Sequence, residues 1–262
     1  NIIKNGFWNS ENFNHLRINT TTFLEDYEPN EKLRLFITQL DFGGTKKVLT
    51  ATQHRKLIES WCFKLPELKE VKFLWLPSKV SQKIFDSICE MENLEGLWIK
   101  WSGIKSINNI SKLKELKHFH LGSSSQVEDI SVLGDMKNLV TLETEQLNKI
   151  VDFSVIGKLT QLQGLGIDGS IWTAQKLENI EFTSSLQALK YLTLTNTQME
   201  QKSFDPLLKL QNLERFNCSW NYPETEFEKL KTIKSLKFGN VETSWKELKE
   251  KLNKQFGNSN YS

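Results

Sequence analysis

The sequence predicts an α/β solenoid, with a curved parallel sheet on its concave face and helices and 3-10 turns on its convex face. Two observations predict it. A phrase recurs eight times between Leu68 and Phe238: an apolar residue, two others, a second apolar residue, one other, and usually a third apolar residue. Its successive first positions lie 20 to 27 residues apart. A fixed phrase at that period indicates stacked units, each of which packs only against its neighbours.

Each phrase is expected to form a strand, because side chains alternate between the two faces of a sheet. The eight strands follow the first positions Leu68, Leu94, Leu116, Leu139, Leu162, Leu189, Leu213 and Ile233. Between strands the apolar residues recur every third position, as in Ile110, Leu113 and Leu116, which suits 3-10 turns or short helices. The two longest units, at 76–93 and 168–188, predict fuller α-helices.

The convex segments carry a second signature. Asp129-Ile130-Ser131 and Asp152-Phe153-Ser154 resemble the short internalin-type leucine-rich repeats of bacteria, and the resemblance covers residues 65–240. It implies a leucine-rich repeat solenoid in which Ser or Asp side chains cap the turns. The chain departs from that family in its uneven repeat lengths, and only Asn221 occupies the expected asparagine position among seven units. We therefore expect variable curvature.

Both ends of a solenoid expose apolar edges and need caps. Residues 1–64 are expected to form an N-terminal cap, with or without a degenerate first repeat, from a strand at 33–40 and a helix at 52–63. Residues 241–262 are expected to form a C-terminal capping helix and tail. There Trp245, Leu248, Leu252 and Phe256 recur at helical spacing after an N-cap at Thr243 or Ser244.

Composition and charge narrow the function. A net charge of +2 gives no support for nucleic-acid binding. The three cysteines match no metal, redox or disulfide pattern, which favours a reducing compartment. No apolar run approaches the length of a membrane span. These features favour a cytoplasmic location. A cleaved signal peptide stays open, because the chain begins at Asn1 rather than at Met.

Motifs for catalysis or cofactor binding receive little support. Residues 164–169 match GxGxxG, but Leu165 and Ile167 are strand anchors, so the match lies within a strand rather than in a phosphate-binding turn. Neither a GxSxG motif nor a phosphate loop is present. We expect no catalytic residues, no cofactor and no enzymatic activity.

The concave face is the candidate binding surface, because the third, fifth and seventh positions of each phrase point away from the core. We expect it to bind an unidentified protein partner. Trp98 is expected to be exposed there, whereas Trp75 and Trp220 are expected to pack at strand ends. The alternative is a metal or small-ligand site, or an enzyme, at His118, His120 and Glu143. The predicted contact set is Trp98, Lys100, His118, His120, Glu143, Glu145, Asp168, Tyr191 and Arg215.

Overall fold

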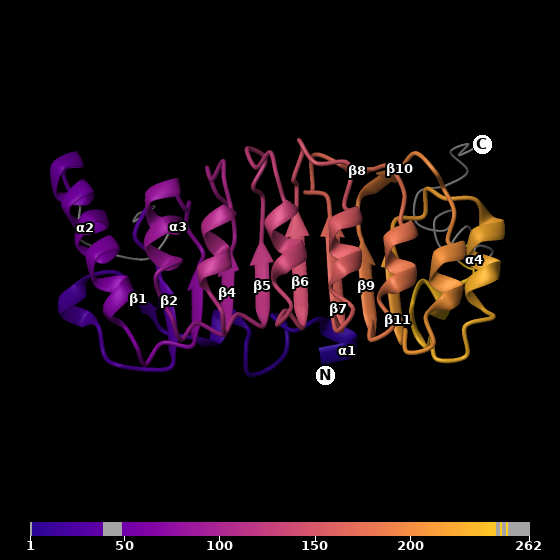
Figure 1. The fold of residues 1–262 in the computed structure, drawn as a ribbon, viewed down its shortest axis with the longest axis horizontal. Coiled ribbons are helices and arrows are strands. Elements are labelled where there is room, and N and C mark those ends of the chain that lie inside the picture. The colour runs from indigo at the N-terminus through magenta and orange to yellow at the C-terminus, as the bar shows by residue number, and fades with distance from the viewer. Residues whose placement is uncertain (1, 39–48, 245–246, 248–249, 251–262) are drawn as a thin grey trace.

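A computed structural model describes residues 2–38, 49–244, 247 and 250. Its centre is a ten-stranded parallel sheet in which each strand pairs with the next along the solenoid (Figure 1). In spatial order the strands are β1 (Thr20–Thr21), β2 (Lys32–Leu35), β3 (Phe73–Leu76), β4 (Gly96–Ile99), β5 (His118–Leu121), β6 (Thr141–Glu145), β7 (Gly164–Asp168), β9 (Tyr191–Leu194), β11 (Arg215–Cys218) and β12 (Phe238–Gly239).

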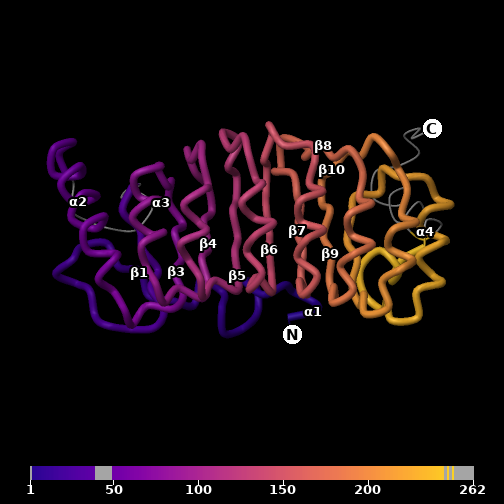
Figure 2. Tube along the Cα trace, in the orientation of Figure 1, coloured from indigo at the N-terminus to yellow at the C-terminus, as the bar shows by residue number. Residues whose placement is uncertain are grey.

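The opposite layer consists of short helices and 3-10 turns (Figure 2). Its α-helices are α2 (Ala51–Lys64), α3 (Gln82–Ile88) and α4 (Glu224–Leu230). A further helix, α1 (Ile2–Asn5), lies near the first residue. Five 3-10 turns repeat along the convex side, at Asn108–Lys112, Ser131–Asp135, Ser154–Lys158, Glu181–Ser185 and Asp205–Lys209. The architecture is thus the predicted leucine-rich repeat solenoid.

Six of the eight phrases have the predicted register. Leu97 pairs with Phe119, Phe119 with Leu142, and the match continues to β11, where Phe216 pairs with Leu192. The register assigned to the first and last phrases is wrong by three residues. Leu74 pairs with Leu97, where Val71 was expected, and Phe238 pairs with Arg215, where Ser235 was expected.

The reason for the first error is local. Residues 65–67 form a 3-10 turn, so Leu68 and Val71 belong to the turn layer, although both are buried like strand anchors. The strand therefore begins later, and Phe73 and Trp75 project from the concave side. At the other end, Gly239 takes the second anchor position, which the apolar pattern could not reveal.

The turns are capped as the family resemblance implies. Asp129 accepts a hydrogen bond from the Ser131 amide at 2.8 Å, and Asp152 does the same for Ser154 at 2.8 Å. These side chains satisfy amides that the start of a 3-10 turn leaves without backbone partners. The apolar residues between strands fill one continuous core, in which Phe204, Phe216, Tyr222 and Phe227 cluster near the last repeats.

The predicted α-helix at 168–188 is wrong. That unit contains the short strand β8 (Gln175–Leu177), paired with β10 (Thr197–Met199), and then a 3-10 turn. Gln175 explains the extended form. Its side chain is buried, donates to the Ile150 carbonyl at 2.8 Å and accepts from the Leu147 amide at 2.8 Å. Trp172 is 91% exposed rather than packed in a helix.

At the N-terminal side, the helix predicted at 52–63 is confirmed as α2, whose Thr50 and Gln53 form a capping box. The strand predicted at 33–40 is the shorter β2, and residues 39–40 lie outside the described residues. Ser244 and Glu247 exchange hydrogen bonds at 3.1 and 3.2 Å, the pattern of a helix start. Trp245, Leu248, Leu252 and Phe256 lie outside the described residues.

Cys62, Cys89 and Cys218 are buried free thiols. Within the described ranges, none of the helices is both long enough and apolar enough to cross a bilayer.

Candidate binding face

Residues 2–18 lie on the concave face, and we call this segment the strap. In Figure 1 the indigo chain runs from α1, below β7, back toward β1. The contacts follow that path. The Lys4 ammonium lies 4.8 Å from the centre of the Phe238 ring in β12, and Arg215 of β11 donates a hydrogen bond to the Lys4 carbonyl. The chain leaves the strap at Ile18 and enters β1 two residues later.

The strap places aromatic rings on the first half of the sheet. Phe7 stacks on His118 at 3.5 Å between ring centres, with 3° between the ring planes. Trp8 meets Trp75 edge-on at 5.6 Å. His15 stacks on Trp98 at 4.7 Å. Because of these contacts Trp98 is only 8% exposed, so the expectation that it would be exposed is wrong. The alternation of the strand was predicted correctly, and what covers Trp98 is a segment outside the repeats.

Trp75 and Trp220, the two tryptophans that were expected to pack at strand ends, pack on different sides of the sheet. Trp220 stacks on Phe227 at 4.7 Å, so it packs in the convex layer as expected. Trp75 is fully buried, but under the strap, because the register of the first strand turns it to the concave side.

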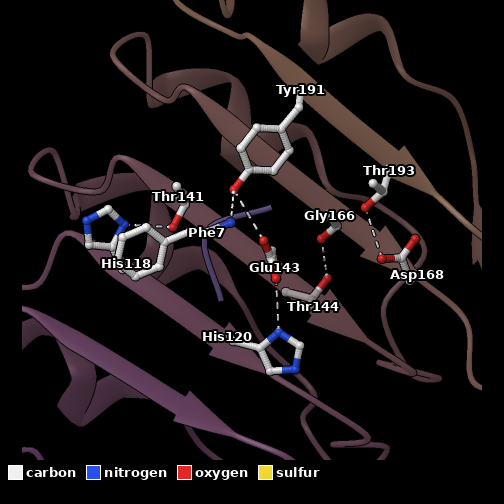
Figure 3. Close-up of polar contacts among 10 residues, drawn as sticks. All are labelled: Phe7, His118, His120, Thr141, Glu143, Thr144, Gly166, Asp168, Tyr191 and Thr193. Atoms are coloured by element: carbon white, nitrogen blue, oxygen red, sulfur yellow. Dashed lines mark hydrogen bonds and ion pairs between the residues drawn. The ribbon is translucent and has the colours of Figure 1, made fainter. Parts of the chain in front are cut away.

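A chain of polar contacts crosses the centre of the face (Figure 3). The Tyr191 hydroxyl donates to Glu143 Oε1 at 3.2 Å and accepts a hydrogen bond from the Phe7 amide at 3.3 Å. The other carboxylate oxygen of Glu143 lies 3.3 Å from His120 Nδ1. Three strands far apart in the sequence, β5, β6 and β9, thus converge on one carboxylate. The predicted neighbours His120 and Glu143 are indeed paired across adjacent strands.

His118 and Asp168 occupy separate half-buried positions. His118 Nδ1 lies 3.0 Å from Thr141 Oγ1, and burial, followed by the charge of Lys117, lowers the pKa of His118 to about 4. Asp168 accepts from the Thr195 amide at 2.6 Å and from Thr193 Oγ1 at 3.0 Å. Burial raises the pKa of Asp168 to about 6 in spite of those bonds.

Arg215 is buried beneath the strap as well. Its guanidinium lies 4.9 Å from the centre of the Tyr191 ring, a cation–π contact, and burial lowers its pKa. Its Nε finds no hydrogen-bond partner among the described residues. Tyr191 itself is 1% exposed. Four predicted contact residues, Trp98, His118, Tyr191 and Arg215, therefore contact the strap directly.

Lys100 and Glu145 belong to a part of the face that stays open. They line a depression of about 600 Å³ beside the strap. Its wall combines two basic groups, a carboxylate and apolar surface, and Ser123 donates to Glu145 at 2.8 Å. Leu16 of the strap is 74% exposed at its rim. The lining residues are His15, Leu16, Arg34, Phe36, Pro77, Lys100, Trp101, Ser123 and Glu145.

The metal interpretation finds no support in this geometry. His118 is directed at Thr141 and His120 at Glu143, so the two imidazoles do not converge on one point (Figure 3). Over residues 2–38 and 49–244, no group of three or more His, Cys, Asp or Glu side chains is placed to hold a metal ion.

The sequence prediction missed the strap residues Phe7, Trp8, Phe13 and His15. A partial signal was available at Gly96, which lacks a side chain at a concave position. A Cβ there would lie 2.5 Å from the Phe73 ring and 3.0 Å from the Trp8 ring, so the space is filled by a neighbouring strand and by the strap. The space at Gly164 is filled from within the sheet, because a Cβ there would lie 2.0 Å from Tyr191 Cζ.

Neither a protein-family model nor a curated protein matches the chain. Similar solved structures exist. An internalin (inlF) from Listeria monocytogenes is 20% identical, with a TM-score of 0.48 over 67% of this chain and 56% of that one. Internalin C2 from the same species is 18% identical, with a TM-score of 0.49 over 70% and 89%.

A leucine-rich repeat protein from Leptospira interrogans is 17% identical, with a TM-score of 0.50 over 80% of this chain and 55% of that one. The chain thus spans about half the length of the inlF and Leptospira structures. Together with the ten parallel strands and their convex turns, the Leptospira likeness shows the fold: the chain is a leucine-rich repeat solenoid that resembles bacterial proteins of this architecture.

Proposed function

We propose that this chain is a non-enzymatic protein-binding module that uses its concave face. The observation that carries the proposal is the open depression beside the strap, where Arg34, Lys100 and Glu145 surround apolar surface from Leu16 and Trp101. Aromatic, apolar and arginine side chains beside charged groups are the mixture found in protein interfaces, where the apolar part supplies affinity and the charges supply specificity.

The support of this surface also favours binding. Arg34 and Glu145 lie within strands of the sheet, and Lys100 and Ser123 come within two residues of the ends of β4 and β5, which are paired in register. A rigid surface loses little conformational entropy when a partner docks. The depression is open to solvent rather than enclosed, whereas a small substrate is usually surrounded by its cleft.

The predicted contact set divides into three groups on this proposal. Lys100 and Glu145 are available to a partner in the described state, and His120, Glu143 and Asp168 are half-buried beside the strap. The remaining four residues become available only where the strap is absent. No second function is proposed, because the polar groups at the centre pair with one another.

The test is affinity capture from the native source, with recovered proteins identified by mass spectrometry. Lys100→Glu reverses a charge at the depression. Lys209→Glu is the matched control, because it makes the same change at an exposed position of the convex turn layer. We expect a protein recovered by the wild type and by Lys209→Glu but lost with Lys100→Glu. Equal recovery of the same proteins by all three would contradict binding at the depression.

A further inference from the structure

We propose that the strap is a displaceable occupant of a peptide-binding groove on the concave face. The groove takes a polypeptide segment of the strap's own chemistry. This is an adjacent aromatic pair whose first backbone amide donates to the Tyr191 hydroxyl, preceded by a backbone carbonyl that accepts from Arg215. The inference rests on the proposed function, because both take the concave face as the binding surface. It adds a second site, beneath the strap, and states what that site binds.

The strap is energetically separate from the main core. The residues between the sheet and the convex turns form one continuous apolar cluster that contains no strap residue. Phe7 and Trp8 form a second cluster with Trp75 and Trp98 on the other side of the sheet. Removal of the strap would leave the first cluster whole and expose the second. The solenoid therefore has a complete core of its own, and the strap is packed onto it.

The strap contacts the sheet in the way that a bound peptide contacts its receptor. Its backbone hydrogen bonds are local turns, such as Gly6 amide to Ile2 carbonyl at 2.7 Å and Ser10 amide to Phe7 carbonyl at 3.1 Å. The sheet holds it through side chains: Arg215 donates to the Lys4 carbonyl, and the Tyr191 hydroxyl accepts from the Phe7 amide. Because side chains of the sheet form hydrogen bonds with backbone groups of the strap, another peptide can form the same hydrogen bonds.

The concave face leaves room for the strap backbone to lie close to the sheet. Gly6 has a φ of +78°, and a Cβ at this position would lie 3.2 Å from Glu143 Oε1. The absence of a side chain at Gly96 makes room for the rings of Phe73 and Trp8, and its absence at Gly164 makes room for the Tyr191 ring. These features form a groove with one narrow point, at Glu143, and one aromatic compartment, at Trp75 and Trp98.

The fit of the strap is incomplete, which makes displacement possible. Trp75 Nε1 and Arg215 Nε are buried beneath it, yet neither has a hydrogen-bond partner among the described residues. The Trp8 indole nitrogen of the strap is in the same situation. A buried donor without an acceptor has lost its hydrogen bonds to water and has formed none within the protein. A partner that offers carbonyl or carboxylate oxygens to Trp75 and Arg215 can therefore compete with the strap, in spite of the tether that keeps the strap close.

The direct test is binding of the strap in trans. A fluorescein-labelled peptide of residues 2–18 is titrated, by fluorescence anisotropy, against the full chain and against a full-chain Phe7→Ala Trp8→Ala variant. We expect the variant to bind the peptide at least tenfold more tightly than the wild type, because its own strap no longer fills the aromatic compartment. A peptide with the same two alanines should not bind. Absence of binding by a variant whose circular dichroism matches the wild type would overturn the proposal, as would equal binding to both proteins.

A second measurement does not depend on a variant. Hydrogen–deuterium exchange of the wild type should show that amides at 7–18 exchange at least tenfold faster than those of β5 to β7, because the strap opens without the sheet. Equal protection of the two regions would show that the strap is an integral part of the fold. The Lys100→Glu capture experiment reports only on the open depression. If the capture experiment fails but the peptide binds, the proposed function at the depression is refuted and the strap inference stands. If capture succeeds but the peptide does not bind, only the strap inference is refuted.

Discussion

The buried imidazole of His118 makes a prediction about pH that can be worked through from the structure. His118 lies between the Phe7 ring and Thr141, and its pKa is about 4, against 6.5 in an unfolded chain. Between these values the unfolded chain binds a proton that the folded chain does not bind, so stability falls as the pH falls through this window. The full difference corresponds to about 3 kcal/mol of unfolding free energy.

Asp168 acts in the opposite direction over nearly the same range. Its pKa is about 6 in the folded chain and 3.8 in the unfolded chain. Here the folded chain binds the extra proton, so acidification stabilises it, again by about 3 kcal/mol. The two effects almost cancel in the wild type. The prediction must therefore be read from variants that remove one group at a time.

The assay is urea unfolding at pH 7, 6, 5 and 4 for the wild type, His118→Phe and Asp168→Asn. His118→Phe keeps a ring against Phe7 and loses only the titrating group and the Thr141 contact, which has no pH dependence of its own. The stability of the wild type minus that of His118→Phe should fall by about 3 kcal/mol from pH 7 to pH 4. The same difference taken with Asp168→Asn should rise by a similar amount.

A change below about 1 kcal/mol in the His118 comparison would refute the reasoning, because it would mean that the imidazole is not held neutral. A loss of stability that levels off between about 1 and 3 kcal/mol has a distinct meaning. If the strap opens when His118 is protonated, the loss of unfolding free energy cannot exceed the free energy of that opening. Exchange of the Phe7 amide at low pH would then rise before the sheet unfolds.

Four further substitutions test the packing. Gly164→Ala should push the Tyr191 ring off its two partners, which lowers stability by about 1–3 kcal/mol and speeds amide exchange in the strap; unchanged exchange would contradict this. Gln175→Leu should cost at least about 3 kcal/mol in urea unfolding, because several buried backbone groups lose their partner; a neutral result would mean that they are solvated. Phe204→Ala should cost about 3–5 kcal/mol, whereas Trp172→Ala, at 91% exposure, should change stability by less than about 0.5 kcal/mol.

The repeat phrase was sufficient to predict the fold and much of the site, because it reports on local packing. Side-chain alternation between Leu97 and Ile99 determines which face Trp98 occupies, and the shared fifth position of the phrase determines that His120 pairs with Glu143. These inferences hold wherever both neighbours of a strand are repeats. They failed for the strand at Phe73, where an apolar turn imitates a strand anchor.

The strap could not be predicted in the same way. Its segment has no repeat and no helical or strand periodicity, and its contacts join residues far apart in the chain. The Phe7 amide bonds to a residue 184 positions away, and Lys4 to one 211 positions away. Such contacts leave little trace in the sequence, and Gly96, whose missing side chain makes room for Trp8 as well as for Phe73, is one example.

The path of the strap also changes how the molecule behaves as a polymer. An ordinary solenoid is a one-dimensional array whose units are coupled only to adjacent units, so one end can fray while the other stays folded. Here a single segment contacts β3 and β5 near one end of the sheet and β9, β11 and β12 near the other. These contacts couple the two ends of the array. Fraying at β12 therefore weakens the packing of the strap at β3. Docking of this segment must wait until distant units have formed, so the contacts that couple the two ends are the last to appear during folding.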